Sequence, residues 1–431
     1  MKALVVGTGG REHALALALA QDPGVTEVHA APGNPGIGEV ATLHDVDPMD
    51  GAAVAALATS IGADLVVVGP EAPLVAGVAD AVRDAGIACF GPSLAAARLE
   101  GSKAFAKEVM ATAGVPTAGS RTCTTADEVA AALDAFGAPH VVKDDALAAG
   151  KGVVVTNDRD EALAHAAGCE RVVVEEFLDG PEFSLFVVCD GTVGRPLLPA
   201  QDFKRVFDGG RGPNTGGMGS YAPLTWLSAG TVETVMAQVV DPTLAEMRRL
   251  GTPFVGCLYV GLALTAAGPK VIEFNVRFGD PDIQPVLALL DSPLGALLAA
   301  AAVGNLAEAP EPTFVDGAAV SVVLASAGYP ETSSKGDVIR GVGRANGVHD
   351  VDVIHAGTAI VDAPEEGDPD HRHLVTAGGR VLAVRAVGYD VDDARRRAYA
   401  AADLITFDGL QRRSDIAAEP LGVVEGAASR G

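Results

Sequence analysis

The segment that decides the fold is KALVVGTGGREH, residues 2–13. Its apolar run at 2–6 is typical of a buried strand, and glycines at positions 7, 9 and 10 separate it from an Ala-rich, helix-like stretch. A strand that turns directly into a helix is the repeating unit of parallel sheets. The backbone N–H groups at such a turn can bind a phosphate. By itself, this turn fits phosphate binding and a plain glycine turn equally well.

The alternation of strand and helix continues through the first hundred residues. We expect further strands at 27–31, 64–68 and 87–90, and helices at 13–21, 52–61 and 73–85. This pattern predicts a doubly wound parallel sheet of the α/β class, with ligands at the carboxyl ends of its strands.

A nicotinamide-binding fold is the first alternative for the glycine turn. Its fingerprint needs a third glycine where this chain has Glu12, and an acidic residue after the second strand, which ends in AAPG at 30–33. Arg11 could instead donate to a single phosphate. The alternative is therefore disfavoured, and soaking with a nicotinamide cofactor under fluorescence readout would test it.

Composition limits the class of protein. The chain has 431 residues, a formal net charge of −25 and 48% hydrophobic residues, which predicts several folded domains. We expect no nucleic-acid partner, because phosphate backbones need a basic surface. No apolar stretch is long enough to span a bilayer, and the first residues lack a signal-peptide pattern. Together with five isolated cysteines, this predicts a cytoplasmic protein without a membrane partner.

The composition also changes along the chain, which predicts its domains. We expect an N-terminal α/β domain at 1–100 and a central region at 101–315 with a small, strand-rich subdomain at about 116–188. A C-terminal α+β domain is expected at 316–424, followed by a frayed tail at 425–431.

A second strand-to-helix turn lies in VVVGPEAPL, residues 66–74. Gly69 and Pro70 force the turn, and Glu71 projects at the mouth of the expected crevice. A carboxylate there suits sugar hydroxyls or an amine, but it serves equally well as the negative charge at a helix N-terminus.

Two lysines surround a loop of small residues. Lys143 ends a strand, and Lys151 follows an Ala-Gly pair. The loop is not a Walker A motif, because Asp145 and Gly152 stand where that motif needs Gly and Ser or Thr. In so acidic a chain the lysines favour a polyphosphate over a solvated hairpin, and Lys103 is a third cation that could join them.

Two strand segments carry the remaining polar groups. VVVEEFLDG at 172–180 could present backbone groups to an adenine edge, although an ordinary hairpin explains it better without context. In VIEFNVRFGDP at 271–281, alternation places Glu273, Asn275 and Arg277 on one face and Ile272, Phe274, Val276 and Phe278 on the other. Two oxygen ligands and a guanidinium fit a divalent cation that bridges phosphates. An amphipathic strand with a wet face is the alternative.

Taken together, these segments resemble the phosphoribosylamine–glycine ligase family of the ATP-grasp superfamily. The resemblance extends over essentially the whole chain and is carried in order by GGREHA at 9–14, GPEAPL at 69–74, LEGSK at 99–103, AAGKG at 148–152, EEFL at 175–178, GPNTGGMG at 212–219, IEFN at 272–275, GDVI at 336–339 and HAGT at 355–358. It implies an ATP-grasp pair of α+β subdomains in the central region. It also implies ATP-dependent ligation of glycine to phosphoribosylamine through glycyl phosphate, in purine biosynthesis.

The resemblance also implies roles for individual residues. ATP would be bound by Lys103, Lys143, Lys151, Gly152, Glu175, Glu176, Phe177, Leu178 and Glu182. The other substrates would be bound by Gly9, Gly10, Arg11, Glu71 and Asp202, and the catalytic set would be Arg277, Lys204, Asn214 and Thr215. Glu273 and Asn275 would hold Mg²⁺ or Mn²⁺. The partners are small molecules; a monomer is expected, and a dimer stays open.

Some positions depart from the family pattern. The segment KDDAL at 143–147 has two carboxylates where the family has Ala and Gly, which is unfavourable beside a polyphosphate unless they face away or are paired. The connection at 162–171 is short, Phe203 stands where the family often has His, and Asp282-Ile283 replaces Glu-Thr. Two alternatives stay open: another ATP-grasp ligase, which would not need GPEAPL, and a relative that binds ATP without turnover.

Overall fold

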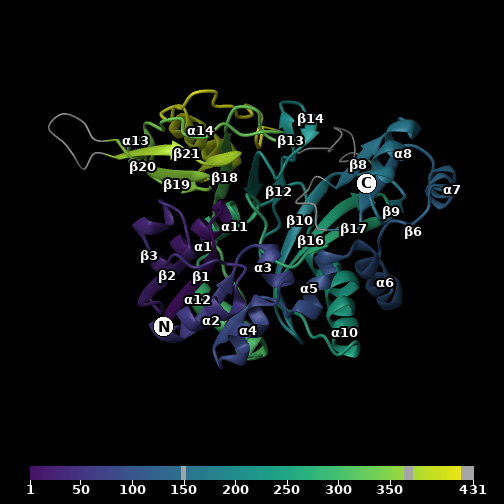
Figure 1. Cartoon of the computed structure of the whole chain (residues 1–431), viewed down its shortest axis with the longest axis horizontal. Coiled ribbons are helices and arrows are strands. Elements are labelled where there is room, and N and C mark those ends of the chain that lie inside the picture. The colour runs from purple at the N-terminus through teal and green to yellow at the C-terminus, as the bar shows by residue number, and fades with distance from the viewer. Residues whose placement is uncertain (147–151, 364–371, 419–431) are drawn as a thin grey trace.

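The N-terminal domain is built on a parallel sheet, as predicted. The computed structural model describes residues 1–146, 152–363 and 372–418. Five strands lie in the order β3-β2-β1-β4-β5 and are all parallel. Figure 1 labels β1, β2 and β3 of this sheet. Their bounds are β1 (Lys2–Gly7), β2 (Glu27–Pro32), β3 (Thr42–Leu43), β4 (Leu65–Val68) and β5 (Ala88–Phe90).

Helices cover both faces of this sheet, which explains why its strands are apolar throughout. Leu4 and Val6 pack into one buried cluster, whereas Ala3 and Val5 pack into another. The helices of this domain are α1 (Gly10–Gln21), η1 (Ile37–Glu39), α2 (Gly51–Ile61), α3 (Glu71–Val75) and α4 (Val78–Asp84). The single helix expected at 73–85 is thus two, because Gly77 adopts a left-handed conformation with φ of 85° between them.

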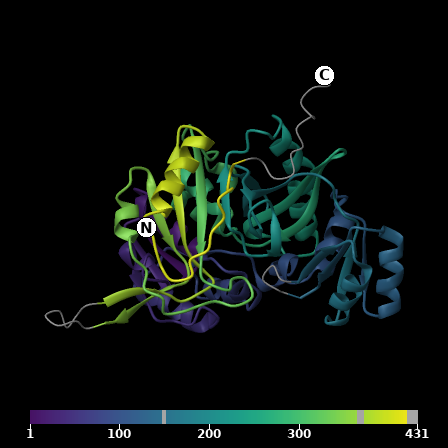
Figure 2. The ribbon, with the colours of Figure 1, turned by 90° about the horizontal axis from the view of Figure 1, so that it is seen from above.

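A small four-stranded sheet with two helices follows α5 (Leu94–Gly101) and α6 (Lys103–Ala113). Its strand order is β6-β9-β7-β8, and it has a separate apolar cluster around Leu133 and Val174. Figure 2 shows this unit at one end of the molecule. The bounds are β6 (Ser120–Cys123), α7 (Ala126–Phe136), β7 (His140–Asp144), β8 (Val153–Thr156), α8 (Arg159–Ala167) and β9 (Val172–Glu175).

The second central sheet is antiparallel and has the order β11-β10-β16-β17. Its strands are β10 (Glu182–Asp190), β11 (Gly194–Pro196), β16 (Val255–Thr265) and β17 (Gly268–Asn275). The prediction that side chains alternate strictly between the two faces of β17 is wrong at one point. A bulge pairs Gly261 with Glu273 but Leu262 with Val271, so Val271 is buried and Ile272 is only partly buried.

A third sheet, of order β12-β15-β18-β22-β19, joins the central region to the C-terminal part. Its strands are β12 (Gln201–Asp202), β15 (Gly219–Ala222), β18 (Ala318–Ala325), β19 (Val351–His355) and β22 (Arg380–Gly388). Because β12 and β15 come from the predicted central region, this sheet crosses the boundary expected at 316, and the domain limits stay predictions.

The remaining elements pack around these sheets. They are β13 (Arg205–Phe207), β14 (Arg211–Asn214), α9 (Thr231–Val235), η2 (Met236–Val240), α10 (Asp241–Arg249), α11 (Ile283–Leu289), α12 (Leu294–Ala302), η3 (Leu306–Glu308), α13 (Val342–Asn346), β20 (Thr358–Asp362), β21 (Arg372–Thr376) and α14 (Val391–Ala402). No helix among the described residues is long and apolar enough to cross a membrane.

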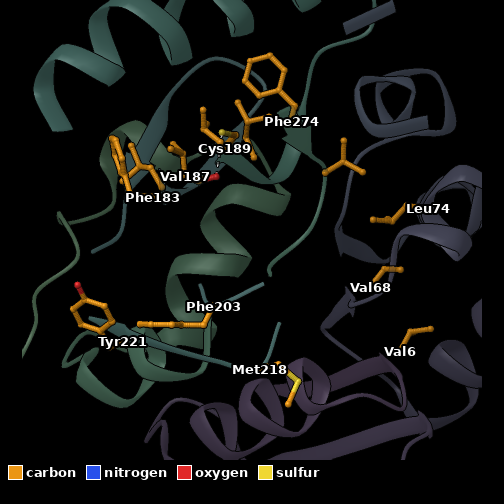
Figure 3. Packing of buried hydrophobic residues seen from close by; sticks show 14 of the residues in the cluster. Val6, Val68, Leu74, Phe183, Val187, Cys189, Phe203, Met218, Tyr221 and Phe274 are labelled. Atoms are coloured by element: carbon orange, nitrogen blue, oxygen red, sulfur yellow. Dashed lines mark hydrogen bonds between the residues drawn. The ribbon is translucent and has the colours of Figure 1, made fainter. Parts of the chain in front are cut away.

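One apolar cluster runs through the interior of the molecule. Figure 3 shows Val6 and Val68 of the parallel sheet, Phe183 and Phe274 of the antiparallel sheet, and Tyr221 of the third sheet. Burial of this continuous apolar surface holds the three sheets against one another, so residues on their edges can form one site.

Candidate functional site

Arg277 connects the end of β17 to the N-terminal domain. Its Nε lies 3.2 Å from Glu71 Oε2, and its Nη2 lies 3.2 Å from Glu100 Oε1 and 3.5 Å from Asn275 Oδ1. Glu100 Oε2 accepts a hydrogen bond of 2.8 Å from the backbone N–H of Val276. The predicted catalytic arginine therefore touches a predicted substrate residue and a predicted metal ligand.

The two carboxylates beside Arg277, Glu71 and Glu100, have pKa values that are shifted in opposite directions. Burial acts to raise the pKa of Glu71, but Arg277 and Arg11 outweigh it and hold that pKa below its usual value. At Glu100, burial prevails over the attraction of Arg277, and the pKa is raised. Arg277 and Arg11 thus favour the ionised form of Glu71, which is the form that binds hydroxyls or an amine.

The glycine turn before α1 lies against the segment that follows β17. Arg11 Nε donates to Glu12 Oε1 at 2.5 Å, and Arg11 Nη1 donates to the carbonyl oxygen of Phe278 at 3.1 Å. The Gly9 N–H donates to Glu12 Oε2 at 2.6 Å. A Cβ at Gly10 would lie 3.0 Å from Asp280 Oδ1. The turn and the Gly-Asp-Pro segment therefore pack closely, and Arg11 is buried between them rather than free.

Lys143 on β7 is buried beside Glu175 at the end of β9. Its Nζ lies 2.9 Å from Glu175 Oε2 and donates to the Ile272 carbonyl oxygen at 2.8 Å. The other oxygen, Glu175 Oε1, lies 3.2 Å from Lys107 Nζ. Sequence reasoning missed Lys107, although its spacing of four residues from Lys103 on one helix was a readable signal.

Glu273 is the ionised group on the open face of β17. Burial opposes its charge, but Lys204, Lys143, Lys103 and Arg277 together hold its pKa below the usual value. No described residue forms a hydrogen bond or ion pair with the Glu273 carboxylate, so its oxygens are available to a cation. Asn275, two residues on, adds an amide oxygen.

Lys204 and Asp202 lie at the junction of the second and third sheets. Lys204 Nζ lies 3.0 Å from Glu182 Oε2. Burial and the neighbouring Asp282 raise the pKa of Asp202 well above its usual value, and its Oδ1 is buried without a partner among the described residues. Asp282 accepts from Ser184 Oγ at 3.3 Å.

The Gly-rich segment at 212–219 folds back onto Lys204. The N–H and the Oγ1 of Thr215 both lie 2.8 Å from the Lys204 carbonyl oxygen, and Thr215 Oγ1 accepts from the Gly217 N–H at 3.0 Å. Arg380, which sequence reasoning also missed, pairs with Asp280 at 3.0 Å and donates to the carbonyl oxygen of Gly216. Asn214 ends β14 next to this loop.

The other residues predicted to bind the nucleotide lie on or next to the small four-stranded sheet. Glu176 and Phe177 are exposed and Leu178 is partly buried after β9, and Lys103 Nζ lies 3.5 Å from the Ala146 carbonyl oxygen. Gly152 accepts from the Asp144 N–H at 2.7 Å. Lys151 lies outside the described residues.

Asp145 is one of the two carboxylates at which the chain departs from the family pattern, and it is paired within the protein. Its charge therefore no longer argues against a polyphosphate nearby. Asp145 is buried, and its Oδ2 accepts from Arg171 Nε at 2.5 Å. Its Oδ1 accepts from the Ala104 N–H at 2.7 Å, near the start of α6. A carboxylate at a helix N-terminus with an arginine partner stabilises the local fold and leaves little charge for a nucleotide to meet. Asp144 accepts from the Ala146 N–H at 3.1 Å.

Comparison with known families matches nearly the whole chain. Three models of phosphoribosylglycinamide synthetase match it: the N domain at residues 1–100, the ATP-grasp (A) domain at 101–283 and the C domain at 319–419. A phosphoribosylamine–glycine ligase from Streptomyces coelicolor is 62% identical over 98% of this chain and 100% of the relative. One from Mycobacterium tuberculosis H37Rv is 54% identical over 96% and 97%.

Solved structures give the same picture of the fold. The crystal structure of phosphoribosylamine–glycine ligase from Thermotoga maritima has a TM-score of 0.81 and 33% identity, and covers 96% of this chain and 100% of that one. The biotin carboxylase domain of Hydrogenobacter thermophilus 2-oxoglutarate carboxylase, in complex with MgADP, has a TM-score of 0.69 and 17% identity over 95% and 91%. At 17% identity, the match to the biotin carboxylase domain shows a similar fold and nothing more.

Proposed function

Because the chain belongs to the phosphoribosylglycinamide synthetase family and has its phosphoribosylamine–glycine ligase activity, we propose a residue-level account of how it joins glycine to phosphoribosylamine. The reaction is a step of purine biosynthesis, and the ATP-grasp fold binds ATP with Mg²⁺. In the proposed route, a carboxylate oxygen of glycine attacks the γ-phosphorus and ADP leaves. The amine of phosphoribosylamine then attacks the carbonyl carbon of glycyl phosphate, and phosphate leaves.

ATP is proposed to bind between the small four-stranded sheet and β17. Lys143 and Lys103 approach this region from β7 and α6, and the exposed segment after Glu175 supplies backbone groups for the adenine edge. Lys151 belongs to this set on the strength of the family pattern alone. These cations offset the charge of a polyphosphate that the acidic surface would otherwise repel.

A divalent cation fits Glu273 and Asn275. The carboxylate of Glu273 is ionised and has no hydrogen-bond or ion-pair partner within residues 1–146, 152–363 and 372–418, and both side chains offer hard oxygen donors on one face of β17. When bound there with ATP, Mg²⁺ or Mn²⁺ would neutralise charge on the phosphate oxygens. Two protein ligands are enough for such a site, because phosphates and water complete the coordination.

The acceptor substrate is proposed to lie at the carboxyl ends of β1 and β4. Backbone N–H groups around Gly9 and Gly10, with Arg11, would hold its phosphate, and Glu71 would hold its ribose hydroxyls or amine. Arg277, Lys204 and the loop at Asn214 and Thr215 would stabilise the charge of the acyl phosphate. No side chain acts as a nucleophile, so catalysis consists of positioning and charge stabilisation.

The observation that carries this proposal is the position of Arg277. One guanidinium contacts Glu71 of the N-terminal domain and Asn275 of the proposed metal site. The proposed site for the amine is therefore next to the proposed site for the γ-phosphate, as transfer of an acyl group between them requires.

The reaction is tested by measuring ADP release with each combination of glycine and phosphoribosylamine, together with formation of glycinamide ribonucleotide. We expect product only when both substrates and ATP are present. ATP binding without turnover would support the non-catalytic alternative, and turnover with a different carboxylate or amine in place of these substrates would indicate another ligase.

The proposed metal site predicts the behaviour of Glu273→Gln. Glutamine keeps the volume but removes the charge, so kcat should fall by on the order of 10²–10³, with partial recovery at high Mg²⁺. Phe274→Ala is the matched control on the buried face; it should lower the free energy of unfolding by about 3–5 kcal/mol. Mg²⁺ titrations of rate and melting curves separate the two effects. Normal turnover of Glu273→Gln at limiting Mg²⁺ would show that this carboxylate is not a ligand.

A further inference from the structure

Lys107 is a largely buried lysine that the proposed mechanism does not use. It lies one turn after Lys103 on α6, and both side chains are therefore on the same face of the helix. Its Nζ donates to Thr117 Oγ1 at 2.9 Å and lies 3.2 Å from Glu175 Oε1. Thr117 Oγ1 in turn donates to the Val271 carbonyl oxygen at 2.7 Å, which ties this group to β17 close to Glu273.

Glu175 is shared between two ammonium groups. Lys107 approaches one carboxylate oxygen and Lys143 the other, at 3.2 and 2.9 Å. The side chains are only 10% (Lys107), 5% (Lys143) and 4% (Glu175) exposed. Burial lowers the pKa of Lys107 to about 8, with Glu175 acting in the opposite direction, so Lys107 is mostly cationic at pH 7. Two cations around one anion leave one positive charge in excess.

We propose that Lys107 is a positioning residue for ATP: it neutralises Glu175, so that the charge of Lys143 stays available to the nucleotide phosphates. The inference rests on the proposed role of Lys143 in binding ATP. Without Lys107, the contact of 2.9 Å between Lys143 and Glu175 would be a closed, neutral pair. Because the group is buried, water screens these charges weakly. A change of one unit of charge therefore alters the electrostatic potential at the neighbouring nucleotide site.

A purely structural lysine is the competing explanation. Such a residue would only tie α6 to β9, and its loss would lower stability without regard to the charge of Glu175. The two explanations predict different results for a double variant. Lys107→Met leaves Glu175 to cancel Lys143, whereas Lys107→Met with Glu175→Gln restores the net charge of the group to plus one.

The test measures the Kd for Mg·ATP by calorimetry. Lys107→Met should weaken ATP binding by on the order of tenfold to a hundredfold, and the double variant should recover most of that loss. KM for glycine and for phosphoribosylamine at saturating ATP should not change. If Lys107→Met does not fold, Lys107→Gln replaces it, because the amide retains hydrogen bonds to Thr117 and Glu175 without the charge. Lys2→Met is the matched control, since Lys2 pairs with Glu27 at 3.0 Å at the solvent-accessible amino ends of β1 and β2.

Three results would overturn the inference. The first is an unchanged Kd for Lys107→Met, and the second is a double variant that binds ATP as weakly as the single one. The third concerns Lys143→Met, which must itself weaken ATP binding. If Lys143→Met binds normally, the proposed role of Lys143 fails and the inference fails with it. If Lys143→Met is weak but Lys107→Met is normal, only the inference about Lys107 fails.

Discussion

Acid should destabilise this protein through two buried histidines that join its N-terminal and C-terminal parts. His13 Nδ1 accepts a hydrogen bond of 2.7 Å from the backbone N–H of His355, and their rings meet edge to face at 5.6 Å. Burial, then the neighbouring His355 and Arg385, lowers the pKa of His13 to about 3. Burial lowers the pKa of His355 to about 4. Both side chains are therefore neutral in the folded protein at pH 5.

The sign of the effect follows from proton binding. Between pH 6.5 and pH 4 the unfolded chain protonates these histidines and the folded chain does not, so stability falls as the pH falls. Each histidine contributes about 1.4 kcal/mol per pH unit below 6.5. At pH 5 that is about 2 kcal/mol each, or about 4 kcal/mol for the pair, relative to pH 7.5.

The assay is urea unfolding followed by circular dichroism at pH 7.5 and pH 5, at constant ionic strength. His13→Asn should halve the loss, because an amide oxygen can accept the same hydrogen bond but does not titrate. His349→Asn is the control, since the His349 side chain is 89% exposed and its replacement should leave the loss unchanged. A loss below about 1 kcal/mol in the unmodified protein, or an undiminished loss in His13→Asn, would refute the reasoning.

Two further predictions concern the glycine turn and the thiols. Arg11→Ala should raise KM for phosphoribosylamine roughly tenfold to over a hundredfold, the effect of losing a charge-assisted contact of about 1.5–3 kcal/mol, and leave KM for glycine nearly unchanged. Its melting temperature should also fall, because Glu12 is buried and loses its partner at 2.5 Å; equal weakening of both substrates would point to a folding defect instead. Burial raises the pKa of all five thiols, to about 12 for Cys89, so iodoacetamide at pH 7.5 should leave activity intact in the folded enzyme. Loss of turnover traced to one labelled cysteine would contradict this.

Local patterns predicted the architecture well. The order of strands and glycine turns in the first hundred residues led to the parallel sheet that the structure contains. Such features depend on neighbours a few residues apart: side-chain period, caps, and glycines at turns that need positive φ. The same local reasoning placed Glu273 and Asn275 on one face of a strand.

Local patterns failed where a contact depends on distant residues. The bulge at Ile272 follows from pairing with β16, and one extra residue there moves Val271 rather than Ile272 into the core. The spacing of Lys107 from Lys103 could be read locally, but its pairing with Glu175 could not, because Glu175 is brought to it only when the small sheet packs against α6.

The sequence by itself therefore determined the parallel α/β character of the N-terminal sheet, the turns at the carboxyl ends of its strands and the row of polar groups on β17. Only the tertiary structure decided which charges meet. Arg277 and Glu71 are 206 residues apart in the chain, and Asp280 and Arg380 are 100 apart. Electrostatic energy depends on separation in space and on burial, and neither can be read from spacing along the chain. The pairing of Arg277 exists only because the apolar cluster holds the three sheets together. The contacts of Glu175 with Lys107 and Lys143 exist only because the small sheet packs against α6.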